Sequence, residues 1–150
     1  MTEDPANKLR TQISIGENGF YRVEIEGEAS AAALAKVIGE IAVFPDSVKE
    51  LWMATKIKLD LSNAELVALA DLAKQMAKRP EKVAIVASDD LTYGLARIYA
   101  GHRETEDNQL TVFRDEDSAL EWLEVDNSSV TPDQLHQEDW KVHTPSASNR

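Results

Sequence analysis

The stretch KVAIVASDDLTYGLARIYAG, residues 82–101, decides the fold class of this chain. Its first part, KVAIVAS, is a short and continuous apolar run, which is typical of a central parallel strand that is covered on both faces. From Asp90 onward the apolar residues recur with the spacing of an α-helix. The side chains expected on the inner face of this helix are Leu91, Leu95, Ile98 and Tyr99. A buried strand followed by a helix predicts one unit of an α/β fold.

Similar strand–helix units lie on both sides of this stretch. ELWMATKIKLDL (50–61) reads as a strand and NAELVALADLAKQMAKR (63–79) as a helix, while LTVF (110–113) precedes the short helix DEDSALEWL (115–123). Strict alternation predicts that Leu51, Met53, Thr55, Ile57 and Leu59 share one face of the strand. The two helices are expected to bury Leu66, Leu69, Ala70, Ala73 and Met76, and Leu120 and Leu123, respectively.

The beginning of the chain predicts a β-hairpin and a helix. In QISIGENGFYRVEIEG (12–27), two alternating runs flank the turn residues GENG, and Arg22, Glu24 and Glu26 are expected to face water. SAAALAKVIGEIA (30–42) follows as a helix with Leu34, Val37, Ile38 and Ile41 on its apolar stripe. The predicted fold class is therefore α/β: a mostly parallel five-stranded sheet, opened by a β-hairpin, with strands in sequential order and helices packed on the sheet.

The chain of 150 residues suits one domain, which we place at residues 11–124. Residues 1–10 are expected to be disordered. Residues 125–150 lose the periodicity, are rich in polar residues, and are expected to form a mobile tail. Within this tail, Thr131 and Pro132 have the order of a helix cap and first turn, so a short helix is expected near 132–139.

Composition excludes several classes of function. The sequence contains no cysteine, so disulfides and thiolate chemistry are excluded. The net charge of −11 argues against a nucleic-acid partner, because phosphates would be repelled. No apolar run has the length of a membrane helix and no signal peptide is recognised, so a cytoplasmic protein is expected. Nine acidic residues against one base, Arg114, between Glu104 and Asp126 form either a solubilising surface or a face for a basic partner.

The order of elements resembles that of STAS domains, and in particular the SpoIIAA-like branch of short bacterial proteins related to anti-sigma-factor antagonists. The resemblance is carried by the GLAR helix within residues 82–101 and by LTVFRDEDSALEWL, residues 110–123. It implies a sheet with strands in sequential order, a regulatory role through protein contacts, and no established enzymatic activity. Some relatives of this fold are also compared with lipid-carrying CRAL-TRIO domains.

Ser62 is the position where the resemblance raises the question of phosphorylation. The antagonists carry their regulated serine in an Asp-Ser-Ser-Gly motif, and the corresponding stretch here, LDLSNAELVALADL (59–72), has no such motif. Ser62 and Glu65 instead form the S-x-x-E pattern of a capping box. We therefore interpret Ser62 as a helix N-cap and predict no phosphorylation site.

No pattern for catalysis, a metal or a cofactor is present in the sequence. The three histidines, His102, His136 and His143, are widely separated and form no metal-binding pair. Neither a glycine-rich dinucleotide motif nor a P-loop occurs. We predict no catalytic residues, no metal and no cofactor.

A speculative ligand site is predicted where strands of a parallel sheet end, because ligands bind outside these carboxyl ends. Its residues are Asp60, Ser88, Asp89, Asp90, Tyr93, Gly94 and Arg97. One interpretation is that the carboxylates of Asp60, Asp89 and Asp90 bind Mg²⁺. The alternative is that Asp89 or Asp90 caps the helix that follows.

Gly94 and Gly101 lie on one side of the helix 90–103, and each costs stability relative to alanine. Either the helix packs closely on the sheet there, or a crevice beside it holds a small apolar ligand.

The sequence as a whole leaves a non-catalytic interaction or regulatory module as the first functional hypothesis, with another protein or a second copy of the chain as partner. A small-molecule binding protein for a lipid or other apolar ligand is the alternative. An enzyme using residues 88–90 has the least support.

Overall fold

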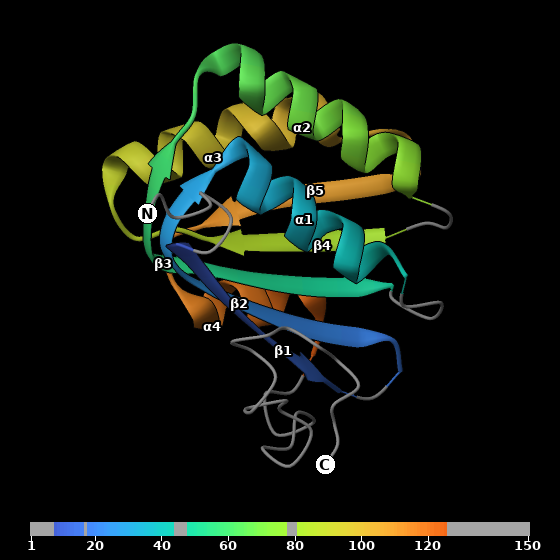
Figure 1. Ribbon diagram of the computed structural model, residues 1–150. Helices are drawn as coiled ribbons and strands as arrows, with labels where there is room; N and C mark the ends of the chain where they lie inside the picture. Colours follow the sequence, from blue (N-terminus) through green and yellow to red (C-terminus); the bar gives the residue numbers. More distant parts are fainter. Residues whose placement is uncertain (1–7, 17, 44–47, 78–80, 126–150) are drawn as a thin grey trace, which may run out of the picture.

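The computed structural model describes residues 8–16, 18–43, 48–77 and 81–125. Figure 1 shows a single five-stranded sheet with four helices among these residues. The strands are β1 (Leu9–Ile15), β2 (Phe20–Ser30), β3 (Lys49–Asp60), β4 (Glu81–Val86) and β5 (Asn108–Phe113). The helices are α1 (Ala31–Ala42), α2 (Asn63–Met76), α3 (Asp90–Arg103) and α4 (Glu116–Leu123).

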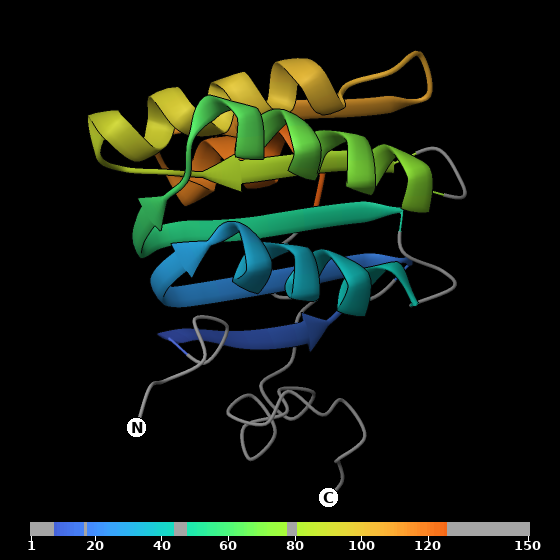
Figure 2. The same cartoon turned by 45° about the horizontal axis from the view of Figure 1, so that its top comes forward.

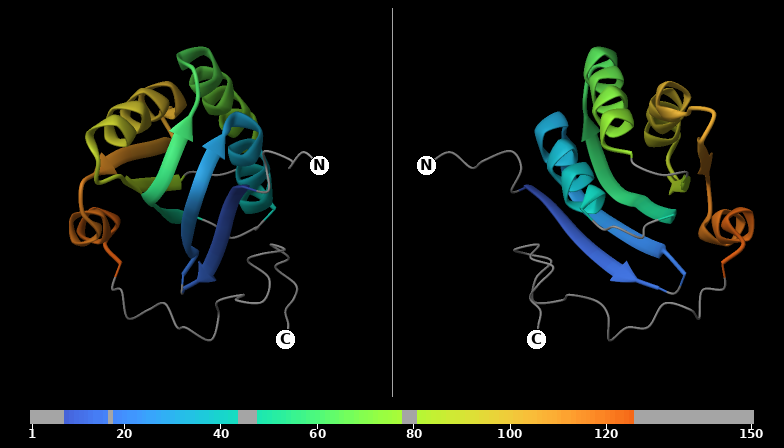
Figure 3. Two further views of the ribbon diagram at one scale, coloured as in Figure 1. Left: turned by 60° about the vertical axis from the view of Figure 1, so that its left-hand side comes forward. Right: turned by 90° about the vertical axis from the view of Figure 1, so that its right-hand side faces the viewer.

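The strands follow one another in the order β1-β2-β3-β4-β5. β1 pairs antiparallel with β2, and every later pair is parallel. Helices α1, α2 and α3 lie side by side over one face of the sheet, whereas α4 covers the other (Figures 2 and 3). The predicted fold class and strand order are confirmed.

β1 begins earlier than the sequence predicted. Leu9 pairs with Gly27 and is buried, and Arg10 pairs with Glu26, although both residues fell within the ten expected to be disordered. The reason is that Leu9 extends the alternation of Thr11 and the isoleucines that follow, so its burial adds to the apolar face of the hairpin. Val125, the first residue of the expected mobile tail, is described and packs against the core beside α4. The rest of that tail, the short helix near 132–139 and the rest of the expected N-terminal disorder lie outside the described residues.

The prediction of one continuous apolar face on β3 was wrong, because the strand contains a bulge. The pairing with β2 shifts between Glu24 and Glu26, where Met53 and Lys56 are the successive partners, so β3 has one extra residue. A bulge of this kind moves the following side chains to the opposite face. Leu51 and Met53 consequently face α4. Trp52, Ala54, Ile57 and Leu59 face α1–α3.

The inner face of α3 also differs from the prediction. Leu91 is 66% exposed and Ile98 is 38% exposed, so neither packs on the sheet. The buried residues of α3 are Thr92, Ala96, Ala100 and Arg103, with Tyr99 half-buried beside them. Small and polar side chains thus face the sheet, and two of the large apolar ones face outward. Periodicity alone could not indicate this because it assigns the inner face to the largest apolar residues.

The apolar faces predicted for α1, α2 and α4 are largely confirmed. α1 buries Val37 and Ile41. α2 buries Leu66, Leu69, Ala70 and Ala73. α4 buries Leu120 and Leu123 against Phe20 and Leu51.

Arg22 does not face water as predicted. Its side chain is only 14% exposed, and it forms ion pairs with Glu24 and with Glu116 of α4. One of the acids in the acidic segment therefore anchors α4 to the sheet.

Candidate functional site

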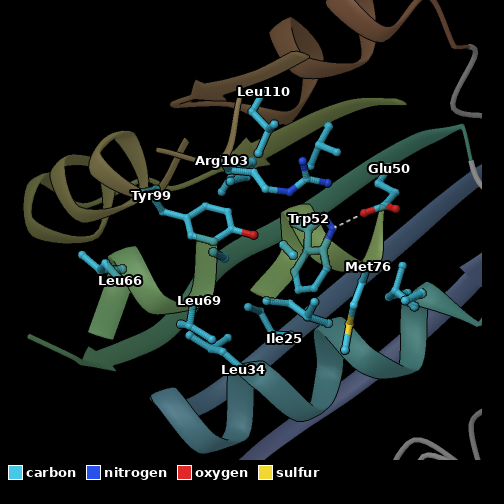
Figure 4. Close-up of a pocket in the computed structure, with 18 of the residues that line it drawn as sticks. Ile25, Leu34, Glu50, Trp52, Leu66, Leu69, Met76, Tyr99, Arg103 and Leu110 are labelled. Carbon is cyan, nitrogen blue, oxygen red and sulfur yellow. Dashed lines mark hydrogen bonds between the residues drawn. The ribbon is translucent and has the colours of Figure 1, made fainter. Parts of the chain in front are cut away.

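A pocket of about 500 Å³ lies between the sheet and α1–α3 (Figure 4). Apolar side chains form most of its wall. The floor comes from β2–β5, for example Ile25, Trp52 and Ile85, and the roof from the helices, for example Leu69 and Met76. The pocket is therefore a mostly apolar space between the helices and the sheet, where side chains normally pack without gaps.

The pocket lies between α2 and the strands of the sheet. α2 packs on α1 and α3 and makes few contacts with the strands beneath it. Alanines occupy lining positions where larger residues would close the gap, among them Ala54 on β3, Ala73 on α2 and Ala96 on α3. Beyond Met53, β3 has no partner in β4, and its apolar residues Ile57 and Leu59 line the pocket near the carboxyl ends of the strands.

The polar groups of the pocket gather toward the amino ends of β3 and β4, near the end of α3. Glu50 and Glu81 lie at the starts of these strands, and Tyr99 and Arg103 reach over the sheet from α3 (Figure 4). Trp52 Nε1 donates a hydrogen bond to Glu50 Oε1 at 2.9 Å. Apart from Thr92 near the start of α3, the pocket thus has one polar end and an otherwise apolar wall.

Arg103 and Glu81 form a buried ion pair within this polar end. Arg103 Nη2 donates to Glu81 Oε1 at 3.2 Å, and the two side chains are 6% and 12% exposed. The second terminal nitrogen, Arg103 Nη1, is buried and has no hydrogen-bond partner among the described residues. Buried guanidinium N–H groups are seldom left in this state because their desolvation is costly.

The environment of Tyr99 provides a test of the polar end by pH. Burial raises the pKa of Tyr99 from the ordinary 10.0 to about 12; the Glu50 and Glu81 carboxylates add to the rise, and Arg103 opposes it. The Tyr99 hydroxyl loses its proton more easily in the unfolded chain than in the folded protein. Its contribution to the free energy of unfolding is therefore complete below pH 10 and is lost as the pH rises toward 12. An absorbance titration should show one tyrosine near pH 12 that disappears in Tyr99→Phe. An unchanged titration in that variant would contradict this assignment.

The residues of the predicted site at the strand ends lie elsewhere. None of Asp60, Ser88, Asp89, Asp90, Tyr93, Gly94 and Arg97 lines the 500 Å³ pocket. Asp89 is the N-cap of α3, and the hydrogen bond from the Thr92 backbone N–H lowers the pKa of its carboxyl group. Asp90 pairs with Arg114, whose guanidinium also lies 4.0 Å from the ring centre of Tyr93. Ligand binding at these residues stays a prediction.

No cluster of potential metal ligands occurs among the described residues, and none of their helices is long and apolar enough to cross a membrane.

The glycines of α3 face away from the pocket. A methyl group added at Gly94 or Gly101 would meet no atom within 4 Å, so close packing does not explain either glycine. The space beside α3 lies instead on its opposite side, where Thr92, Ala96 and Tyr99 line the pocket.

Gly94→Ala is therefore expected to stabilise the protein by up to about 1 kcal/mol, because alanine restricts the unfolded chain and favours helix. Chemical denaturation of the variant and the unaltered protein measures this difference. Gly101→Ala, in the last turn, is the matched second variant. A loss of stability in both would show that the outer face of α3 is covered by something in the folded protein.

Ser62 caps α2 as predicted. Its side chain accepts from Glu65 N at 3.1 Å, and Glu65 Oε1 accepts from Ser62 N at 2.9 Å, which completes the capping box.

Ser62→Ala is expected to cost about 1 kcal/mol of stability, whereas Ser62→Asp should be nearly neutral because aspartate also caps helices. Denaturation with urea measures both variants. Equal losses in alanine and aspartate would mean that the hydroxyl has a role other than capping.

Sequence reasoning missed the polar end of the pocket. Glu50 and Arg103 are single charged residues at the ends of amphipathic elements, and such residues usually lie in solvent. One indirect signal was present in the sequence. Glu50 lies on β3 and Arg103 on α3, two elements whose inner faces carry small residues such as Ala54 and Ala96, which leave room for a larger polar side chain.

No family model and no curated protein matches the sequence. The fold is similar to that of an anti-sigma factor antagonist from Mycobacterium paratuberculosis, with a TM-score of 0.56, 17% identity, and coverage of 82% of this chain and 99% of that one. It is also similar to an uncharacterized protein with a SpoIIAA-like fold from Shewanella loihica PV-4, with a TM-score of 0.50, 19% identity, and coverage of 77% and 93%.

These similarities identify the class of the domain. Together with the sequential sheet and its N-terminal hairpin, they show that this chain has the SpoIIAA-like fold expected from the sequence. At these identities they establish the fold alone.

Proposed function

We propose that this protein binds a small apolar molecule in the pocket between α1–α3 and the sheet. The observation that carries the proposal is the 500 Å³ apolar space beneath α2. Protein interiors normally pack with few voids larger than a water molecule. Ligand pockets, by contrast, occupy about 300–1,000 Å³ and combine apolar walls with a few polar groups.

The proposal is a binding function without a reaction. The acids that the sequence offered for catalysis have structural partners, since Asp89 caps α3 and Asp90 pairs with Arg114. Within the pocket, Glu81 is paired with Arg103, and Glu50 accepts the Trp52 hydrogen bond. This arrangement supports holding and orienting a ligand.

Native mass spectrometry of the full chain, purified gently from its own cells, tests the proposal. We expect a fraction of the protein to carry one apolar adduct per chain, which extraction into organic solvent removes. A bare protein that also fails to take up any apolar probe in titration would refute the binding function.

Protein–protein contact is a second candidate function, favoured by the outer face of α3. Leu91 and Ile98 lie two helical turns apart on one face of α3, and both are exposed. The anti-sigma factor antagonist with a similar fold supports a regulatory interaction of this kind. A partner retained by the unaltered protein and lost in the Leu91→Glu/Ile98→Glu double variant would establish this role.

A further inference from the structure

The outer face of α3 has a composition that packing among the described residues does not explain. Four exposed residues follow one stripe on the side of α3 turned away from the sheet: Leu91, Gly94, Ile98 and Gly101. α3 lies at the margin of the helix layer, beside α2 (Figure 2). A methyl group added at either glycine would meet no atom within 4 Å, although each glycine costs the helix about 1 kcal/mol relative to alanine. The two glycines therefore serve no contact within the described part of the chain.

The spacing of this stripe is complementary to itself. Large residues and glycines alternate along α3 at intervals of three, four and three residues, and the centre of the pattern lies at the level of Ala96. In an antiparallel pair of α3 helices related by a twofold axis at this level, Leu91 of one copy comes level with Gly101 of the other. Ile98 comes level with Gly94 in the same way. Each large side chain then meets a position without a side chain, which permits a close approach of the two helices.

Charged residues beside the stripe also suit a second copy. Asp90 and Arg97 are seven residues apart, so they lie along the same edge of the stripe, and both are exposed. In the antiparallel pair, Asp90 of one copy and Arg97 of the other are separated along this edge by five residues of helix rise, about 7.5 Å, which these side chains can span. The twofold axis produces this pair of opposite charges twice.

The electrostatic surroundings of α3 favour this face over other surfaces of the chain for self-association. The net charge of −11 disfavours contact between two copies wherever acids dominate the surface. Asp90 is the one acid within α3. Arg97 lies 6.0 Å from the ring centre of Tyr93 and forms no ion pair with the described residues. Its guanidinium is therefore available to a carboxylate of a second copy.

We infer that the outer face of α3 binds the same face of a second copy of this chain, in an antiparallel contact with twofold symmetry. This inference rests on the second function proposed above, protein contact through α3, and names the partner. A pair of single helices buries less than the standard interface of about 1,600 Å², so the dimer is expected to be weak, with a dissociation constant of about 10–1,000 µM.

Sedimentation equilibrium of the full chain, from about 5 µM to 1 mM, measures this association. Gly94→Leu places a large side chain level with Ile98 of the other copy, so it should weaken the dimer at least about tenfold. The same variant should leave the stability of the single chain unchanged or raised, because leucine favours helix and the space at Gly94 is open. Glu121→Leu, at an exposed position of α4 on the other face of the sheet, is the control and should not alter the association.

A charge exchange tests the antiparallel arrangement itself. Arg97→Glu and Asp90→Lys each bring like charges together in a dimer of identical chains, so each should weaken association about tenfold. In an equimolar mixture, the introduced glutamate of one chain meets the introduced lysine of the other. The unaltered Asp90 and Arg97 meet at the second, symmetry-related position. The mixture should therefore associate at least about tenfold more tightly than either variant alone.

The outcomes separate this inference from the function on which it rests. A chain that stays monomeric to about 1 mM, or a mixture that associates no better than its components, overturns the inference. So does a dimer that persists in the Leu91→Glu/Ile98→Glu double variant. Protein contact through α3 still stands if the unaltered chain retains a different protein that this double variant loses. It fails if neither a second copy nor another protein depends on these residues.

Discussion

Replacing Arg103 with methionine is expected to lower the free energy of unfolding by about 3–5 kcal/mol. The substitution removes the guanidinium partner of Glu81 at a site where the two side chains are 6% and 12% exposed. Taking one ion away from a buried pair costs far more than taking both, because the remaining charge stays desolvated. Urea denaturation at neutral pH measures the loss.

The Glu81→Gln/Arg103→Met double variant is the control for this prediction. It should recover most of the lost stability, because the carboxylate of Glu81 no longer remains without its guanidinium partner. A single Arg103→Met variant as stable as the unaltered protein would mean that Arg103 and Glu81 are solvated, and the polar end described above would not exist.

Filling the pocket from its roof should abolish ligand binding with little cost in stability. Ala73 lies on α2 and lines the pocket, so the ring in Ala73→Phe can enter open space. We expect the affinity for an apolar probe to fall by at least about tenfold, since one methylene-sized change in a pocket already alters binding by 1–3 kcal/mol. Dye titration and thermal denaturation measure the two effects.

Ala119→Phe is the matched control, because Ala119 is also a helix alanine but is fully buried in the close-packed layer between α4 and the sheet. Overpacking there should cost about 1–3 kcal/mol or more, while ligand binding is retained in the folded fraction. Equal losses of stability in Ala73→Phe and Ala119→Phe would contradict the prediction, because they would mean that the space beneath α2 is as closely packed in solution as the layer beneath α4.

The overall fold could be predicted from the sequence because its signals are local. KVAIVAS had the continuous apolar character of a buried strand, and Ser62 with Glu65 marked the beginning of α2. The strand order then followed from the alternation of strands and helices.

The candidate site could not be predicted in the same way, because it depends on departures from these regular patterns. The extra residue of β3 after Met53 turns Trp52 and Ile57 to the same side, which a strict alternation forbids. The inner face of α3 carries Ala96 and Arg103 while Leu91 points outward, so the pocket forms where periodicity predicts a filled core. The space itself is bounded by α2 and the sheet, an arrangement of distant segments that no local sequence pattern records.

The proposed function requires that an apolar molecule occupies the space between α1–α3 and the sheet. Amide NMR of the full chain during titration with dodecanol tests it most directly. We expect saturable shifts, at one ligand per chain, at residues lining the pocket, such as Ile25, Leu69 and Tyr99. Shifts confined to the outer face of α3 around Leu91 and Ile98, or the absence of saturable shifts, would contradict it.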